Sequence, residues 1–125
     1  MTDKAKNITE SLKSVLEADL NVEFAVSFGS ILNKEKFRDV DVAVYFIKPP
    51  EGFDLLEYMV KLDKAVGIEV DLNVLNSAGP FLRHQVFKTG EPLFIRDFIK
   101  YADFRDRTIA DYQEYKYITG LDKYD

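Results

Sequence analysis

Three short stretches of the chain carry apolar residues at every second position, at residues 22–28, 40–46 and 68–74. This period is that of a β-strand, so three strands are predicted. Apolar residues at helical spacing surround them, over about residues 8–19, 55–67, 80–90 and 98–118. Residues 92–95 add a short edge strand, and residues 30–36 are expected to form a short helix or turn. This order predicts an α/β (α+β) fold, with helices on a mixed sheet of about four strands and a C-terminal helix.

The length and charge of the chain narrow the classes of function. Its 125 residues fit one compact domain. Seventeen basic and 22 acidic residues give a net charge of −5, which argues against binding long nucleic acids. The absence of cysteine excludes disulfides and thiolate metal sites. We expect a cytoplasmic protein, because the sequence shows neither a signal-peptide core nor an apolar run long enough to cross a membrane.

Three aspartates on two of the predicted strands point to a metal site. Asp39 and Asp41 share one face of their strand, opposite the valines, with Cα atoms about 7 Å apart. Asp71 occupies the equivalent face of the strand at 68–74 and would join them if the two strands are neighbours. Three carboxylates without a counter-ion repel one another, so this grouping favours bound cations such as a pair of magnesium ions. Solvation of an exposed sheet face is the alternative interpretation.

A glycine–serine pair, Gly29-Ser30, ends the first predicted strand, and eight residues separate it from Asp39. Backbone N–H groups at such a turn, together with the serine hydroxyl, can bind a phosphate group. The pair could also simply end the strand and cap the next helix. Three basic residues in the following loop could contact a triphosphate or form an ordinary solvated surface: Lys34, Lys36 and Arg38.

These motifs together resemble the polymerase-beta-like nucleotidyltransferase superfamily. The resemblance is carried by Phe28-Gly29-Ser30, Asp39-Val40-Asp41-Val42 and Val70-Asp71-Leu72. Within that superfamily the chain is similar to the minimal nucleotidyltransferases, the MNT (MntA-type) antitoxins. The resemblance covers about residues 8–95, and residues 97–120 form a C-terminal helical extension of the same single domain, 1–125.

The resemblance implies a function for each motif. Gly29 and Ser30 would bind the triphosphate of a nucleotide, with ATP as the expected substrate. Asp39 and Asp41 would hold Mg²⁺, and Asp71 would help to bind a second Mg²⁺ and activate the acceptor hydroxyl. The reaction would transfer AMP and release pyrophosphate. The acceptor would be a tyrosine of a partner HEPN toxin, which the modification silences.

Two other functions remain open on the sequence alone. A non-catalytic antitoxin of the same fold could mask a toxin by contact through the C-terminal helix, and a third option is transfer to a small molecule. The lone histidine, His84, is expected to be a surface or partly packed residue. The tyrosines of the last helix are expected mainly in the core and at its rim. The oligomeric state is left open, homo-oligomers included.

Overall fold

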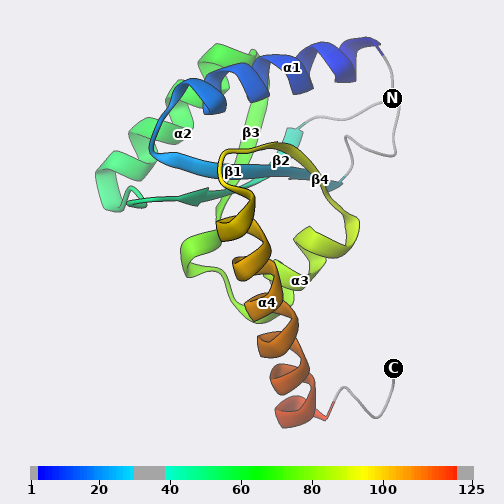
Figure 1. Cartoon of the computed structure of the whole chain (residues 1–125). Coiled ribbons are helices and arrows are strands. Elements are labelled where there is room, and N and C mark those ends of the chain that lie inside the picture. Colours follow the sequence, from blue (N-terminus) through cyan, green and yellow to red (C-terminus); the bar gives the residue numbers. More distant parts are fainter. Residues whose placement is uncertain (1–2, 30–38, 121–125) are drawn as a thin grey trace.

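The computed structural model describes residues 3–29 and 39–120, in which helices cover both faces of one sheet (Figure 1). The predicted short helix or turn at 30–36 lies outside the described residues. The order of elements confirms the expected α+β architecture: α1 (Asp3–Ala18), β1 (Val22–Phe28), β2 (Asp39–Phe46), α2 (Gly52–Val66), β3 (Glu69–Val74), the 3₁₀ turn η2 (Leu75–Ser77), α3 (Pro80–Thr89), β4 (Glu91–Ile95) and α4 (Phe98–Thr119).

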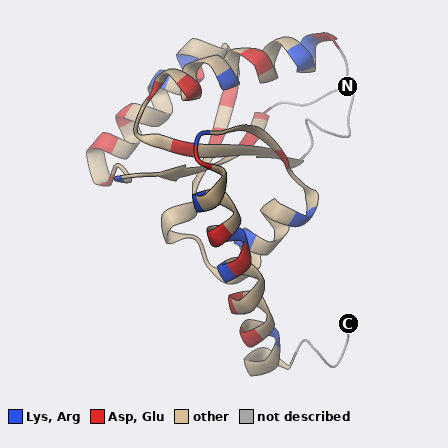
Figure 2. Ribbon diagram, viewed as in Figure 1, with Lys and Arg blue, Asp and Glu red and all other residues tan. Residues whose placement is uncertain are grey.

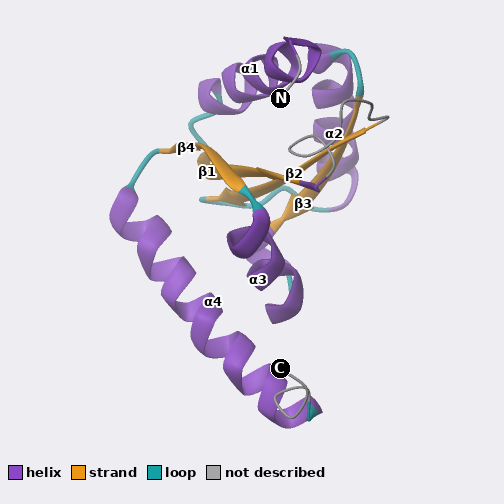
Figure 3. Cartoon of the chain, turned by 90° about the vertical axis from the view of Figure 1, so that its right-hand side faces the viewer, coloured by secondary structure: helices purple, strands orange, loops and turns teal. Residues whose placement is uncertain are grey.

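The four strands form a mixed sheet in the order β3-β2-β1-β4. Strand β1 pairs antiparallel with β2 and with β4, whereas β2 pairs parallel with β3 through the crossover helix α2. Figure 3 shows α1 and α2 on one side of the sheet and α3 and α4 on the other. No helix in the described part of the chain is long and apolar enough to cross a membrane.

The face of the sheet beneath α1 and α2 is covered by aliphatic side chains. The valines of β2 and β3 alternate inward and meet the buried apolar residues of the two helices, as their period-two pattern predicts. Helix α2 ends at Gly67, whose φ of 82° places it in the left-handed conformation that favours glycine. The fully buried residues of this cluster include Leu12, Leu16, Val22, Val42, Val44, Phe46 and Leu62.

The opposite face of the sheet carries an aromatic cluster that attaches α3 and α4. Phe24 lies at its centre, stacked on Tyr45 with ring centroids 5.2 Å apart and edge-on to Tyr101 at 5.0 Å. Phe104 contacts Tyr45 at 4.7 Å, and Phe87 of α3 contacts both helix and sheet aromatics. Such pairs contribute beyond the apolar area they bury. This cluster holds the first half of α4 against the sheet.

Strand β1 departs from the simple alternation expected from its sequence. Val22 packs under α1, but Phe24 packs in the aromatic cluster on the other face. The pairing with β2 shifts by one residue between these two positions, which is the signature of a β-bulge. Because β1 is central and both faces are covered, residues that the pattern placed outward, such as Ala25, are also buried.

Helix α4 continues beyond the aromatic cluster and projects from the body of the molecule (Figure 1). The side chain of Asp97 caps its start by accepting hydrogen bonds from the N–H groups of Ile99 and Lys100. Acidic and basic positions are interspersed along the helix (Figure 2). Several large apolar side chains of α4 are exposed, including Ile109, Tyr117 and Ile118.

Truncation of the aromatic cluster should loosen α4 and destabilise the fold. We expect Phe104→Ala to lower the free energy of unfolding by about 3 kcal/mol, because a buried aromatic side chain is replaced by a cavity. Ile99→Ala on the same helix is the matched control and should cost less than about 0.5 kcal/mol, because that side chain is largely exposed. Urea denaturation followed by circular dichroism measures both. Equal losses for the two variants would contradict the assigned packing.

Candidate active site

The three predicted aspartates lie on the two adjacent parallel strands, β2 and β3. Asp41 is directly paired with Asp71 in the strand register, and Asp39 is paired with Glu69. The alternate residues Val40 and Val70 are buried under α1 and α2, so the carboxylates occupy the opposite face. The neighbour relation that the sequence could only assume for Asp71 is therefore present. Figure 2 shows acidic positions on these two strands.

The carboxyl group of Asp41 is the most perturbed group of the site. The pKa of this carboxyl is raised from 3.8 to about 6, first by its partial burial and then by the neighbouring side chain of Asp71. The negative charges of Asp71 and Asp39 contribute to the same rise. The site thus holds more negative charge than its surroundings neutralise, which is the condition that favours a cation.

Gly29, the first residue after β1, lies against the carboxylate of Asp41. Its φ of 83° is in the left-handed region, where other residues are strained. A Cβ atom at this position would also overlap Oδ2 of Asp41 and lie 3.2 Å from its Cγ. The left-handed φ is therefore the reason that glycine is favoured here, and the overlap shows how closely the backbone approaches the Asp41 carboxylate. The predicted phosphate-binding turn and the predicted metal site are in direct contact.

The remainder of the predicted phosphate-binding segment lies outside the described residues. This holds for Ser30 and for the basic residues Lys34, Lys36 and Arg38. Their contribution to a triphosphate site stays a prediction from the sequence. Gly29 and Asp39, which flank this segment, are both described and mark where it begins and ends.

The chemistry of the donors fits Mg²⁺. Carboxylate oxygens are the ligands that this hard cation prefers, and the like charges of Asp39 and Asp71 act on the carboxyl of Asp41. Within residues 3–29 and 39–120, no three acidic or histidine side chains are already placed around one ion position. Binding would therefore need side-chain rotation, and the assignment of Asp39, Asp41 and Asp71 as metal ligands remains a prediction.

Two further polar residues share this face of β3, although the sequence assigned them no function. Glu69 lies opposite Asp39 and adds a fourth carboxylate at the start of the strand. The side-chain amide of Asn73 donates to the carbonyl of Val42 at 3.5 Å and to that of Asp71 at 3.3 Å. Strand parity alone placed both side chains beside Asp71, but nothing in the sequence indicated which main-chain groups Asn73 contacts.

His84 is not part of the carboxylate site. It lies on α3 and its ring stacks on Tyr112 of α4, with centroids 3.6 Å apart and planes 9° from parallel. Arg83 beside it forms an ion pair of 2.8 Å with Asp111. These contacts join α3 to the projecting part of α4, which agrees with the expectation of a partly packed histidine.

Comparison with known proteins gives an independent result. The family model "Polymerase beta, Nucleotidyltransferase" matches residues 10–99. A chain of a toxin–antitoxin structure with AMP-PNP is 25% identical, with a TM-score of 0.79 over 90% of this chain and 93% of that one. A chain of the tri-AMPylated Shewanella oneidensis HEPN toxin in complex with MNT antitoxin is 24% identical, with a TM-score of 0.75 over 94% and 93%. A chain of the toxin–antitoxin complex MntA–HepT is 23% identical, with a TM-score of 0.76 over 93% of this chain and 93% of that one. No curated protein matches the sequence.

These matches confirm the resemblance inferred from the motifs. The residues covered by the family model include Gly29, Asp39, Asp41 and Asp71. The structures at 23% and 24% identity establish the shared fold, since a TM-score near 0.75 over almost the whole chain requires the same arrangement of elements.

The raised pKa of Asp41 predicts a pH-dependent stability. Because the folded protein holds this proton more tightly than the unfolded chain, the stabilisation is complete below pH 3.8 and is lost as the pH rises to about 6. Two pKa units correspond to about 2.7 kcal/mol, which partial solvent exposure of the carboxyl reduces to about 1 kcal/mol. Between pH 4 and pH 7, the free energy of unfolding of wild type should therefore fall by about 1 kcal/mol more than that of the Asp41→Asn variant.

Urea unfolding of both proteins in EDTA-containing buffer at several pH values measures the difference. Asp106→Asn, an exposed aspartate of α4, serves as the control and should follow wild type. Parallel pH profiles for wild type and Asp41→Asn would show that the carboxyl of Asp41 is not perturbed.

Proposed function

The chain belongs to the polymerase beta nucleotidyltransferase family, and we propose that it transfers AMP from ATP to a tyrosine hydroxyl of a partner HEPN toxin. In this role it is the antitoxin of a toxin–antitoxin pair, and the modification silences the toxin. The observation that carries the proposal is the direct register pairing of Asp41 with Asp71 beside Gly29. This arrangement supports the proposal, because a phosphate-binding turn at Gly29 and a cation site at the carboxylates would then be neighbours.

Asp39, Asp41 and Asp71 would hold Mg²⁺ in this site. When bound, the ions supply positive charge at the α-phosphate and lower the pKa of the attacking hydroxyl. The pKa of about 6 for Asp41 leaves its carboxyl largely ionised at neutral pH, as a ligand must be. The like charges that raise this pKa are those that a cation would neutralise.

Other steps of the proposed reaction are assigned to residues of the chain itself. The N–H groups at Gly29 and Ser30, with the serine hydroxyl, hold the triphosphate. Asp71 accepts the proton of the acceptor hydroxyl as its oxygen forms a bond to the α-phosphorus. The bond from the α-phosphorus to the bridging oxygen breaks, and pyrophosphate leaves with that electron pair. The products are an AMP-modified tyrosine and pyrophosphate.

A protein acceptor agrees with the architecture of the chain. The exposed apolar residues of the projecting half of α4, such as Tyr117 and Ile118, offer a surface for a partner protein. The structures matched by this chain include a toxin–antitoxin complex with AMP-PNP and one with a tri-AMPylated HEPN toxin.

The same exposed surface on α4 favours a second candidate function, a non-catalytic antitoxin that masks the toxin by contact alone. Such a protein does not need Asp39, Asp41 and Asp71 on one face. The family match and the Asp41–Asp71 pairing therefore favour the enzyme. Transfer to a small molecule would give a labelled product in the absence of any protein partner.

Loss of one carboxylate should abolish the transfer. We expect Asp41→Asn to lower the rate of AMP transfer by at least about 100-fold, since the charge that holds the metal is removed. The measurement is labelling of a HEPN toxin from the same genome with ATP labelled in its α-phosphate, in the presence of Mg²⁺. Asp106→Asn should retain wild-type labelling. Equal labelling by Asp41→Asn would refute the assigned site.

Turnover separates the enzyme from a masking protein. We expect one molecule of wild type to silence many molecules of toxin ribonuclease when ATP and Mg²⁺ are present. When EDTA is added, the chain should no longer silence more than one equivalent of toxin. The triple variant Asp39→Asn, Asp41→Asn, Asp71→Asn should lose this activity while still folding. Neutralisation that always needs a full equivalent of the chain, with or without ATP, would support masking instead.

A further inference from the structure

The open face of β2 and β3 changes from charged to apolar along the two strands. Asp41 is paired with Asp71, and the next pair on the same face is Ala43 with Asn73. Ala43 is fully buried in the aromatic cluster, whereas Asn73 is partly exposed. Asn73 is therefore a polar residue at the border between the carboxylates and the apolar part of this face.

The side-chain amide of Asn73 is held in one orientation by the main chain. Its nitrogen lies 3.5 Å from the carbonyl oxygen of Val42 and 3.3 Å from that of Asp71, and it donates to both. The reversed amide would place its oxygen against two carbonyl oxygens with no proton between them. The amide oxygen therefore faces away from these carbonyls, and no described residue donates a hydrogen bond to it. Asn73 thus offers an oriented, uncharged acceptor beside Asp71.

We propose that the amide oxygen of Asn73 accepts a hydrogen bond from a ribose hydroxyl of the nucleotide. The inference rests on the proposed function, in which the triphosphate lies at Gly29 and the α-phosphate lies beside Asp41 and Asp71. A hydroxyl donates to an amide oxygen without any change of protonation. Residues 71 and 73 are about 7 Å apart along the strand. In a nucleotide, the ribose hydroxyls follow the α-phosphate at a separation of similar scale.

The order of chemical groups along the two strands matches the order of groups along a nucleotide. The carboxylates that would hold cations for the phosphates come first, the neutral amide of Asn73 comes next, and the aromatic cluster with Ala43 and Leu75 comes last. A nucleotide has phosphates, ribose hydroxyls and a largely apolar base in the same order. A further carboxylate in place of Asn73 would repel the phosphates, whereas an amide accepts a hydrogen bond without adding charge.

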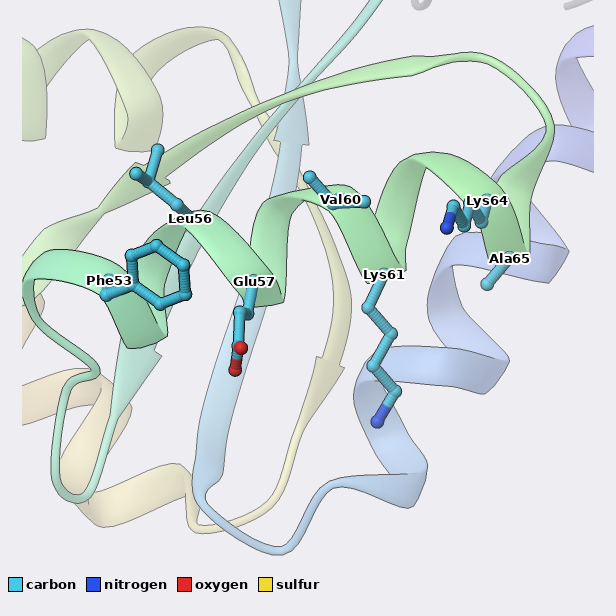
Figure 4. A pocket seen from close by; sticks show the side chains of 7 residues that line it. All are labelled: Phe53, Leu56, Glu57, Val60, Lys61, Lys64 and Ala65. Carbon is cyan, nitrogen blue, oxygen red and sulfur yellow. The ribbon is translucent and has the colours of Figure 1, made fainter.

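A hollow on α2 is the competing location for a nucleotide. Figure 4 shows Phe53, Leu56 and Val60 in a row along this helix, with Lys61 projecting beside them. An aromatic ring can stack on a base, and lysines bind phosphates. However, α2 covers the face of the sheet opposite the carboxylates, so a nucleotide held there would be on the wrong side for transfer. A variant at Lys61 is therefore the matched control for one at Asn73.

Calorimetric titration of the full chain tests the contact, with Mg²⁺ present and without any toxin. The ligands are ATP, 2′-deoxy-ATP and 3′-deoxy-ATP. Wild type should bind one of the two deoxy analogues about fivefold more weakly than ATP, the loss expected for one hydrogen bond. Asn73→Ala should bind ATP about fivefold more weakly than wild type and should no longer distinguish ATP from that analogue. Lys61→Ala should keep the affinities of wild type.

The ratio of two affinities measured on one preparation does not depend on the fraction of the chain that is folded, so a partly unfolded variant still gives a result. The inference is overturned if wild type binds ATP and both analogues equally, or if Asn73→Ala keeps the wild-type ratio. Loss of ATP binding by Lys61→Ala would place the nucleotide on α2 and also overturn it.

The same titrations separate this inference from the proposed function. If wild type does not bind ATP at all, both are overturned. If the expected ratios are found but no toxin is labelled, the contact of Asn73 with the nucleotide is supported and the proposed transfer to a toxin is contradicted.

Discussion

The parallel pairing of β2 with β3 is the interaction on which the rest of the structure depends. It aligns Val40 with Val70 on one face and Asp41 with Asp71 on the other. Burial of the valines under α1 and α2 fixes this register, because a slip of one residue would turn the aspartates into an aliphatic core. The free energy that holds the carboxylates together therefore comes from the opposite face of the sheet, where the apolar side chains leave water.

The two faces of the sheet are packed differently, one with aliphatic and the other with aromatic side chains. Helices α1 and α2 cover one face with close-packed aliphatic side chains. On the other face, the aromatic cluster around Phe24 and Phe104 attaches α3 and α4 and leaves the carboxylates uncovered. A fully covered second face would bury ionised groups at high cost. Partial exposure keeps Asp41 ionisable near neutral pH, as its pKa of about 6 indicates.

The central relations of the site could be predicted from the sequence because they depend on local geometry. The common face of Asp39 and Asp41 follows from the period of a strand, and the turn at Gly29 follows from the end of an alternating run. The bulge in β1 could not be predicted in this way, because it depends on pairing with β2 across the sheet. The stacking of His84 on Tyr112 likewise depends on how α3 meets α4, to which the two residues belong.

The amino-acid sequence by itself determined the kind and order of the α-helices and strands, the glycine turn and the face on which each aspartate lies. These properties depend on the conformation of a few neighbouring residues. Only the tertiary structure decided that β3 lies next to β2, that Asp71 faces Asp41 in register and that Gly29 contacts the Asp41 carboxylate. Each of these facts joins residues far apart in the chain, and such contacts are selected by packing of the whole core rather than by local pattern.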